Sequence, residues 1–139
     1  MKELLSVIAV WLSVSFGLAP VQDLPGVRTL PPQALSEIRY GPVDVTRRRE
    51  VLALYDERTQ TIFLSEGWVS HDPAKVSILV HEMVHHLQSE ASSTFPCPAA
   101  RERLAYDAQA RWLALFGLTL EGEFGIDAMT LKVNSGCMR

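Results

Sequence analysis

The most regular pattern of apolar positions lies between residues 73 and 89. When this segment is placed on a helix at about 100° per residue, its apolar side chains fall on one face. They are Val76, Leu79, Val80, Met83, Val84 and Leu87. Asp72 can cap the start of such a helix, and Pro73 suits its first turn. The pattern therefore predicts an amphipathic helix from Pro73 to about Ser89 that packs this face on the core.

Upstream of this helix, the pattern changes to that of β-strands. Apolar side chains alternate over residues 51–55, a polar tip follows at 56–60, and β-branched and apolar residues return at 61–64. These features predict a β-hairpin. Earlier in the chain, a segment rich in proline is expected to hold a short strand near Val27 to Leu30 and a short helix at Gln33 to Arg39.

A second helix is predicted downstream, from about Ala99 to Phe116, where Gly117 ends it. Together, these elements give an α+β fold class, in which a β-hairpin or small antiparallel sheet packs on two helices. The sequence shows no internal repeat and no low-complexity tract. Residues 20–139 are therefore expected to form a single domain.

The N-terminal segment MKELLSVIAVWLSVSFGLA, residues 1–19, is nearly uncharged from Leu4 to Ala19. As a helix, that stretch spans roughly 24 Å, which is short of the ~30 Å hydrocarbon core of a membrane. We therefore expect residues 1–19 to be a signal peptide and the protein to be exported, either periplasmic or secreted. Because Pro20 would follow a cut after Ala19, a cut after Gly17 or an uncleaved N-terminal anchor stays open.

The composition of the chain is that of an ordinary globular protein, and its charge argues against nucleic-acid binding. Of the 139 residues, 47% are apolar and 21% are charged, as in an ordinary globular domain. The net charge of −3 leaves no basic footprint for nucleic acid. The basic run Arg47-Arg48-Arg49 is expected to be a solvated turn. We expect a monomer that contacts a membrane only if the N-terminal segment is retained.

Export bears on the two cysteines, Cys97 and Cys137. An oxidising compartment allows them to pair, and small exported domains often need such a cross-link. The bond would close a loop of about 41 residues, which the chain-entropy model values at roughly 4 kcal/mol. We predict this disulfide. The alternative is two unrelated thiols, with Cys137 on a frayed tail.

The polar side of the helix at 73–89 carries the candidate chemistry. His81 and His85 are four residues apart and share a face opposite the apolar stripe, so two imidazole nitrogens can meet at one metal ion. Glu82 lies one step round the helix and would reach a water at that metal. The sequence His81-Glu82-Met83-Val84-His85 is the HExxH pattern. His86 points elsewhere and is expected to be a supporting or a surface residue.

A catalytic zinc site of this kind needs a third protein ligand. A histidine six residues after His85 is absent, because position 91 is Ala. A carboxylate is the other usual solution. On the second helix, Asp107 has an arginine four residues away on either side and is expected to form surface ion pairs. Glu102 lies on a largely apolar face without such a partner, so we prefer Glu102 over Asp107.

A hairpin, an HExxH helix and a second helix with a glutamate resemble the minimal zincin core in its glutamate-liganded, gluzincin-like form, over about residues 50–116. More closely, ALYDERTQTIFLSEGW, HEMVHHLQ, CPAARERLAYDAQARWL and the terminal cysteine are similar to a family of small exported bacterial proteins of unknown function. The zincin resemblance implies zinc held by His81, His85 and Glu102, with Glu82 as general base. Two features depart from it. Position 106 is Tyr, so the Glu-x-x-x-Asp signature of thermolysin-like proteins is missing, and no large second subdomain builds a deep specificity pocket.

The function expected from these features is that of an exported zinc metallopeptidase that hydrolyses peptides or proteins. Glu82 would accept a proton from the attacking water, and Tyr106 is either an oxyanion donor or a packed core residue. An extended substrate could pair with Thr61–Leu64 if that strand forms an exposed edge. The alternatives are a non-catalytic module that uses zinc to hold its fold, and a non-haem iron site. Glu82 favours hydrolysis, because neither alternative needs it.

Overall fold

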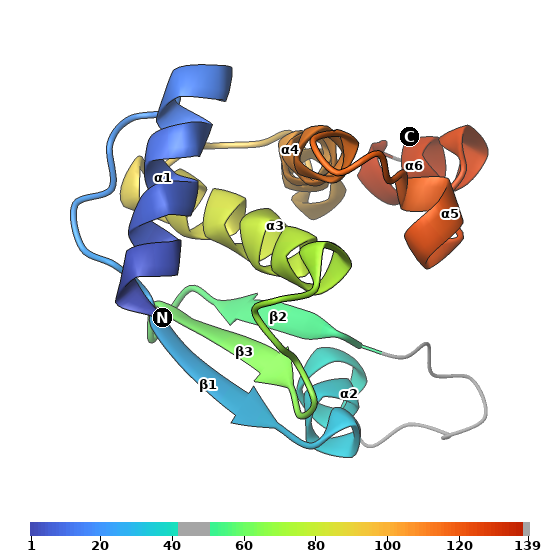
Figure 1. The fold of residues 1–139 in the computed structure, drawn as a ribbon, viewed down its shortest axis with the longest axis horizontal. Coiled ribbons are helices and arrows are strands. Elements are labelled where there is room, and N and C mark those ends of the chain that lie inside the picture. Colours follow the sequence, from blue (N-terminus) through green and yellow to red (C-terminus); the bar gives the residue numbers. More distant parts are fainter. Residues whose placement is uncertain (42–50, 138–139) are drawn as a thin grey trace.

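A three-stranded sheet forms one layer of the fold (Figure 1). The structure is a computed structural model that describes residues 1–41 and 51–137, so Arg47-Arg48-Arg49 lies outside the described residues. The strands are β1 (Gly26–Leu30), β2 (Ala53–Asp56) and β3 (Thr61–Ser65), in the order β1-β3-β2. β2 and β3 form the predicted antiparallel hairpin, with Leu54 opposite Phe63.

The first strand extends this hairpin to a mixed sheet. β1 runs parallel to β3, with Val27 opposite Ile62. Parallel neighbours need a long crossover, and the chain from β1 to β3 contains α2 (Pro32–Tyr40) as well as β2. β3 is therefore paired on both sides, and the condition for substrate pairing at Thr61–Leu64, an exposed edge, is not met. Within the described ranges, the edge strands are β1 and β2.

The helix predicted from the apolar stripe is α3 (Pro73–Glu90). The Asp72 side chain caps it by accepting a hydrogen bond from the Ala74 backbone N–H at 3.0 Å. Every residue of the predicted stripe is buried, with an exposed fraction of 5% or less. Figure 1 shows α3 crossing the centre of the molecule, with the sheet on one side and α4 (Glu102–Ala114) on the other. The α+β class expected from the sequence is confirmed.

The second predicted helix begins with a tighter geometry than expected. Residues Pro98–Arg101 form a 3₁₀ turn, η2, so the α-helix α4 starts at Glu102 and not at Ala99. Such turns are common at the start of an α-helix. At the other end, a turn follows Ala114 and closes at Gly117, whose φ of 72° suits glycine. Glu102 therefore occupies the first position of α4.

The N-terminal segment is a helix packed against the rest of the fold. α1 (Lys2–Phe16) ends at Gly17 and buries one face in the same core cluster as α3 and α4; the residues of that face are Leu5, Ile8, Ala9 and Leu12. The rings of Trp11 and Trp112 meet edge to face, with 5.2 Å between their centroids. None of the helices in the described part of the chain is long and apolar enough to cross a membrane. Cleavage of residues 1–19 stays a prediction.

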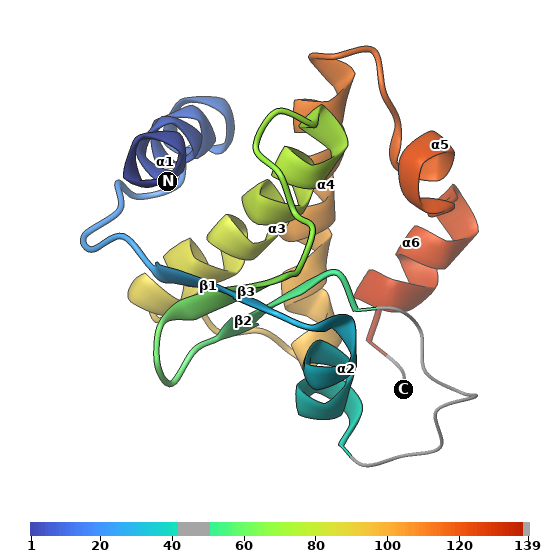
Figure 2. The same ribbon diagram turned by 60° about the horizontal axis from the view of Figure 1, so that its bottom comes forward.

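Two short helices that the sequence patterns did not indicate follow α4. They are α5 (Leu120–Phe124) and α6 (Ala128–Ser135). Each begins at a capping side chain: Thr119 accepts from the Gly122 N–H at 2.9 Å, and Asp127 accepts from the Thr130 N–H at 2.7 Å. Figures 1 and 2 place both helices at the end of the molecule away from α1. Elements this short have too few turns to show an apolar period, which explains why they were missed.

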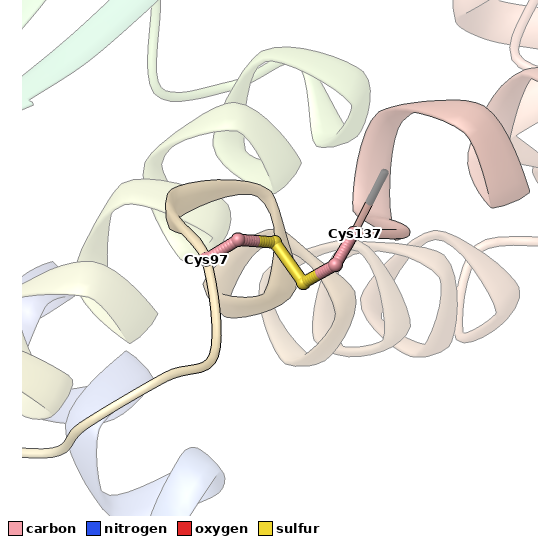
Figure 3. Close-up of a disulfide and its surroundings, with 2 residues drawn as sticks. All are labelled: Cys97 and Cys137. Carbon is pink, nitrogen blue, oxygen red and sulfur yellow. A yellow bond between two sulfur atoms is a disulfide. The ribbon is translucent and has the colours of Figure 1, made fainter. Parts of the chain in front are cut away.

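Cys97 and Cys137 form the predicted disulfide (Figure 3). The bond joins Cys97, just before η2, to Cys137, two residues after the end of α6, with 5.8 Å between the two Cα atoms. The C-terminal helices are thus attached to the start of α4 and do not form a frayed tail. A disulfide is typical of proteins outside the reducing cytosol, which agrees with the oxidising compartment expected from the sequence. Export itself stays a prediction.

Candidate metal site

Three side chains from two helices converge at one point. His81 and His85 project from α3, and Glu102 projects from the first position of α4. His81 Nε2 lies 2.8 Å from Glu102 Oε2, and His85 Nε2 lies 3.1 Å from Glu102 Oε1. One potential ligand atom from each residue lies within 4.8 Å of the others, so the group could hold a metal ion. The fold thus brings together the three residues that the sequence nominates as ligands.

The carboxylate of this cluster is ionised, which suits a cation. Burial opposes ionisation of Glu102, but hydrogen bonds from His81 and His85 outweigh it and hold the pKa of Glu102 well below its usual range. Burial also opposes the charged form of His85, yet the hydrogen bond to Glu102 and the charge of Glu82 raise the pKa of His85. Two imidazole nitrogens and an ionised carboxylate are the donor set of His₂Glu zinc sites, and they also suit non-haem iron.

Glu82 stands beside the cluster without belonging to it. Its side chain leaves α3 one residue after His81 and is 7% exposed, yet it lines the same cavity as the three ligands. Burial raises the pKa of Glu82, and the neighbouring charges of His81 and His85 only partly offset this effect. A carboxylate with a raised pKa is a stronger proton acceptor than an exposed one. Glu82 is therefore adjacent to the three candidate ligands but is not one of them.

Tyr106 also faces the site. Its ring meets that of His81 edge to face, with 4.6 Å between centroids, and it lines the cavity from α4. Burial and the negative charge of Glu102 raise the pKa of Tyr106, while a hydrogen bond with Asn134 acts in the opposite direction. The phenol therefore keeps its proton at neutral pH and can donate it in a hydrogen bond. Asn134, from α6, was not a candidate because no local pattern in the sequence indicates that α6 lies here.

Two glutamines that were not named as functional residues contact the histidines from behind. Gln109 Oε1 accepts from His81 Nδ1, and Gln88 Oε1 accepts from His85 Nδ1, both at 2.9 Å. Both glutamines are buried, at 5% and 8% exposure. The signal was available, since Gln109 falls on the same inward helix face as Glu102 and Gln88 falls on the same helix face as His81 and His85.

His86 is not a surface residue. Its side chain is fully buried between the sheet and the segment that precedes β1. Nε2 donates to the Asp23 backbone carbonyl at 2.6 Å, and Nδ1 accepts from the Tyr55 hydroxyl at 2.9 Å. Glu90, one turn further along α3, accepts from the backbone N–H groups of Gln22 and Asp23. His86 therefore supports the fold by linking α3 to β2 and to the segment that precedes β1. It is not part of the metal group.

The site opens into a cavity of about 1020 Å³. The candidate ligands, Glu82 and Tyr106 lie on one side, carried by α3 and α4. The other walls come from β2, from the end of α2, from η2 and from α5 and α6, with Tyr55, Ile38, Phe95, Phe124 and Ile126 among the apolar side chains. The C-terminal helices, which the disulfide attaches to the start of α4, thus supply part of the cavity wall.

A matched pair of substitutions tests the third ligand. Asp107 lies exposed on α4 and outside the metal group, whereas Glu102 lies inside it. Glu102→Gln should weaken zinc binding by more than the roughly 10–100-fold typical of losing an outer-shell partner, because it replaces an anionic ligand with a neutral amide. Asp107→Asn should leave zinc binding unchanged and cost less than about 1 kcal/mol of stability. Competition with a chromophoric chelator measures both, and the opposite ranking would assign the ligand to Asp107.

Comparison with known proteins places this geometry in a family context. A model of one protein family, described as Domain of unknown function (DUF6647), matches residues 1–139 and thus includes α1, the metal group and both cysteines. No curated protein and no solved structure matches the chain. The match agrees with the resemblance to a family of unknown function, whereas the resemblance to zincins has no counterpart in it. The chain belongs to the family described as Domain of unknown function (DUF6647).

Proposed function

We propose that this protein is a zinc-dependent metallopeptidase, in which His81, His85 and Glu102 hold the metal and Glu82 is the general base. One observation carries the proposal: three ligand atoms meet at a single point, and a fourth, buried carboxylate faces the same cavity without joining them. A purely structural metal site has no need for that carboxylate, whereas hydrolysis requires a base beside the metal.

The residues of this chain have distinct parts in the proposed reaction. Zinc at these ligands would supply a Lewis acid that activates water and polarises a substrate carbonyl. Glu82 accepts the proton of the attacking water and then gives it to the leaving amine. Tyr106 donates its hydroxyl proton in a hydrogen bond to the carbonyl oxygen as negative charge develops there. The raised pKa of Tyr106 suits this role, because only the protonated phenol can donate.

The edge of β2 is the best candidate for binding an extended substrate. The Ser65 N–H donates to the Leu52 carbonyl at 3.0 Å, so these two residues are a hydrogen-bonded pair across the hairpin. Because such pairs alternate along antiparallel strands, the backbone groups of Ala53 and Tyr55 point away from β3. Both residues line the cavity. A peptide laid along this edge would bond to those groups and pass in front of the metal group.

Metal analysis combined with digestion of a broad peptide library tests the proposal. Protein purified without added metal should contain close to one zinc per chain, and it should cleave some of the peptides. His85→Ala should lose both the metal and the activity, because it removes one of three ligands. Iron in place of zinc would favour the non-haem iron alternative. Full zinc content in His85→Ala would overturn the ligand assignment.

A non-catalytic zinc module is the second candidate, because the same ligands join α3 to the start of α4. A metal ion in that position would stabilise the packing of the two helices. Zinc-loaded wild-type protein that cleaves nothing in the library, and unfolds when the zinc is removed, would favour this second function.

A further inference from the structure

The orientation of both metal-site histidines is determined by a second layer of side chains. We propose that Gln88 and Gln109 are positioning residues that hold a proton on Nδ1 of His85 and of His81, so that Nε2 of each histidine is the atom that would bind a metal. This inference rests on the metal centre of the proposed function, and it does not depend on whether the protein is a peptidase. It adds two residues, and the partners behind them, to the machinery of the site.

The contact behind His85 can be arranged in only one way. The Gln88 amide touches the Arg101 backbone carbonyl at 3.1 Å and His85 Nδ1 at 2.9 Å. A carbonyl oxygen only accepts hydrogen bonds, so the amide must present its Nε2 there as the donor. Its Oε1 is then left to face the imidazole, and this oxygen only accepts. His85 Nδ1 must therefore carry the proton.

Behind His81, the chain of hydrogen bonds includes one more side chain, that of Ser77, and it also places the proton on Nδ1. The Ser77 hydroxyl donates its single proton to the Ala74 backbone carbonyl at 2.6 Å. Its oxygen can then only accept, and Gln109 Nε2 donates to it at 3.2 Å. Gln109 Oε1 therefore faces His81 Nδ1 at 2.9 Å as an acceptor. Each chain of hydrogen bonds ends on a backbone carbonyl that cannot reverse its direction.

These contacts select the form of the imidazole that binds a metal. A neutral histidine has one protonated nitrogen, so a proton fixed on Nδ1 leaves the Nε2 lone pair as the ligand. In both residues Nε2 is the atom that faces the Glu102 carboxylate, as a hydrogen-bond donor at 2.8 and 3.1 Å, and a bound metal ion would take the place of that proton. Turning either ring over would break a buried hydrogen bond. The two glutamines thus organise the ligand set before the metal arrives.

Zinc affinity measures this role directly, using zinc ions and a competing chromophoric chelator. Gln88→Leu and Gln109→Leu remove the acceptor while keeping similar size, and each should weaken zinc binding by about 10–100-fold. The same substitution at Gln33, an exposed glutamine on α2, is the matched control and should bind zinc as the wild type does. Thermal denaturation of each zinc-free variant identifies any that do not fold. Wild-type affinity in both folded leucine variants would overturn the proposal.

The glutamate variants distinguish positioning from simple packing. In Gln109→Glu the carboxylate can still accept from His81, and the Ser77 hydroxyl can turn to donate to its second oxygen. That variant should bind zinc at least as tightly as Gln109→Leu binds it, and within about tenfold of the wild type. In Gln88→Glu the second oxygen would meet the Arg101 carbonyl, so affinity should stay as low as in Gln88→Leu. Equal zinc affinity of Gln109→Glu and Gln88→Glu would contradict the hydrogen-bond directions assigned to the two glutamines.

A spectroscopic measurement addresses the tautomers without reference to activity. In ¹⁵N–¹H long-range correlation spectra of the zinc-loaded wild type, both site histidines should show a protonated Nδ1 and a metal-bound Nε2. Binding of zinc through Nδ1 in either residue would refute the proposal while leaving a metal site in place. A wild type that binds no zinc at all would instead refute the metal centre of the proposed function.

Discussion

The Glu82→Gln protein should keep its zinc and its fold and lose peptide hydrolysis by about 10²–10⁴-fold, the usual contribution of a general base. Glutamine has the size of glutamate but cannot accept a proton from water at neutral pH. Since Glu82 lies outside the group of three ligands, the substitution should not release the metal. Cleavage of any peptide found in the library, measured at equal zinc content, gives the ratio of the two rates.

Glu57→Gln is the matched control for this experiment. Glu57 lines the same cavity but is exposed, beside β2 and away from the metal group. The control should retain the rate of the wild type. A Glu82→Gln protein as active as this control would rule out the proposed mechanism, and loss of zinc from Glu82→Gln would show that Glu82 is a ligand.

Removal of residues 1–19 should destabilise the folded protein severely. Leu5, Ile8 and Leu12 are each 2% exposed or less, and full burial of such a side chain contributes about 1.5–3 kcal/mol. Their sum is comparable to the whole stability of a typical domain, roughly 5–15 kcal/mol. Loss of α1 would also expose Trp112 on α4. Thermal and urea denaturation of residues 20–139 against the full chain measures the effect.

Point substitutions on the two faces of α1 separate packing from length. Ile8→Ser introduces a polar group at a fully buried position and should lower stability strongly, whereas Val14→Ser, at 81% exposure, should change it by less than about 0.5 kcal/mol. The mass of the protein recovered after expression then shows whether α1 is cut away. If residues 20–139 are as stable as the full chain, the signal-peptide prediction is favoured. If only the full-length mass is recovered after expression, retention of α1 is favoured.

Local sequence was sufficient to predict the positions of residues that lie on a single helix or hairpin. His81, Glu82 and His85 occupy their relative positions because residues one and four apart have set directions on a helix, and the apolar stripe sets which side turns inward. The hairpin of β2 and β3 follows from alternation and a polar tip in one short stretch. The choice of Glu102 over Asp107 also came from a single helix, since only one of the two lies on its inward face.

Contacts between distant segments were beyond this kind of inference. β1 joins the sheet because the chain passes through α2 and β2 before β3 returns beside it, and no local pattern encodes that neighbour. α1 illustrates the same limit, since an apolar stretch before a small residue has the composition of a signal peptide and of a packed helix alike. Whether such a stretch packs as a helix depends on the complementary surface of α3 and α4, which exists only once those helices have packed.

The sequence by itself determined the α+β class, the amphipathic helix, the HExxH spacing and the two cysteines that pair, because each follows from periodicity or from residue chemistry. The tertiary structure alone decided the distances that make a site of them. Glu102 meets His81 and His85 because α4 packs along α3, and Gln109 reaches His81 for the same reason. Asn134 reaches Tyr106 because α6 lies beside α4. Helical periodicity fixes the direction of a side chain, but only the packing of one helix on another fixes which atom it will touch.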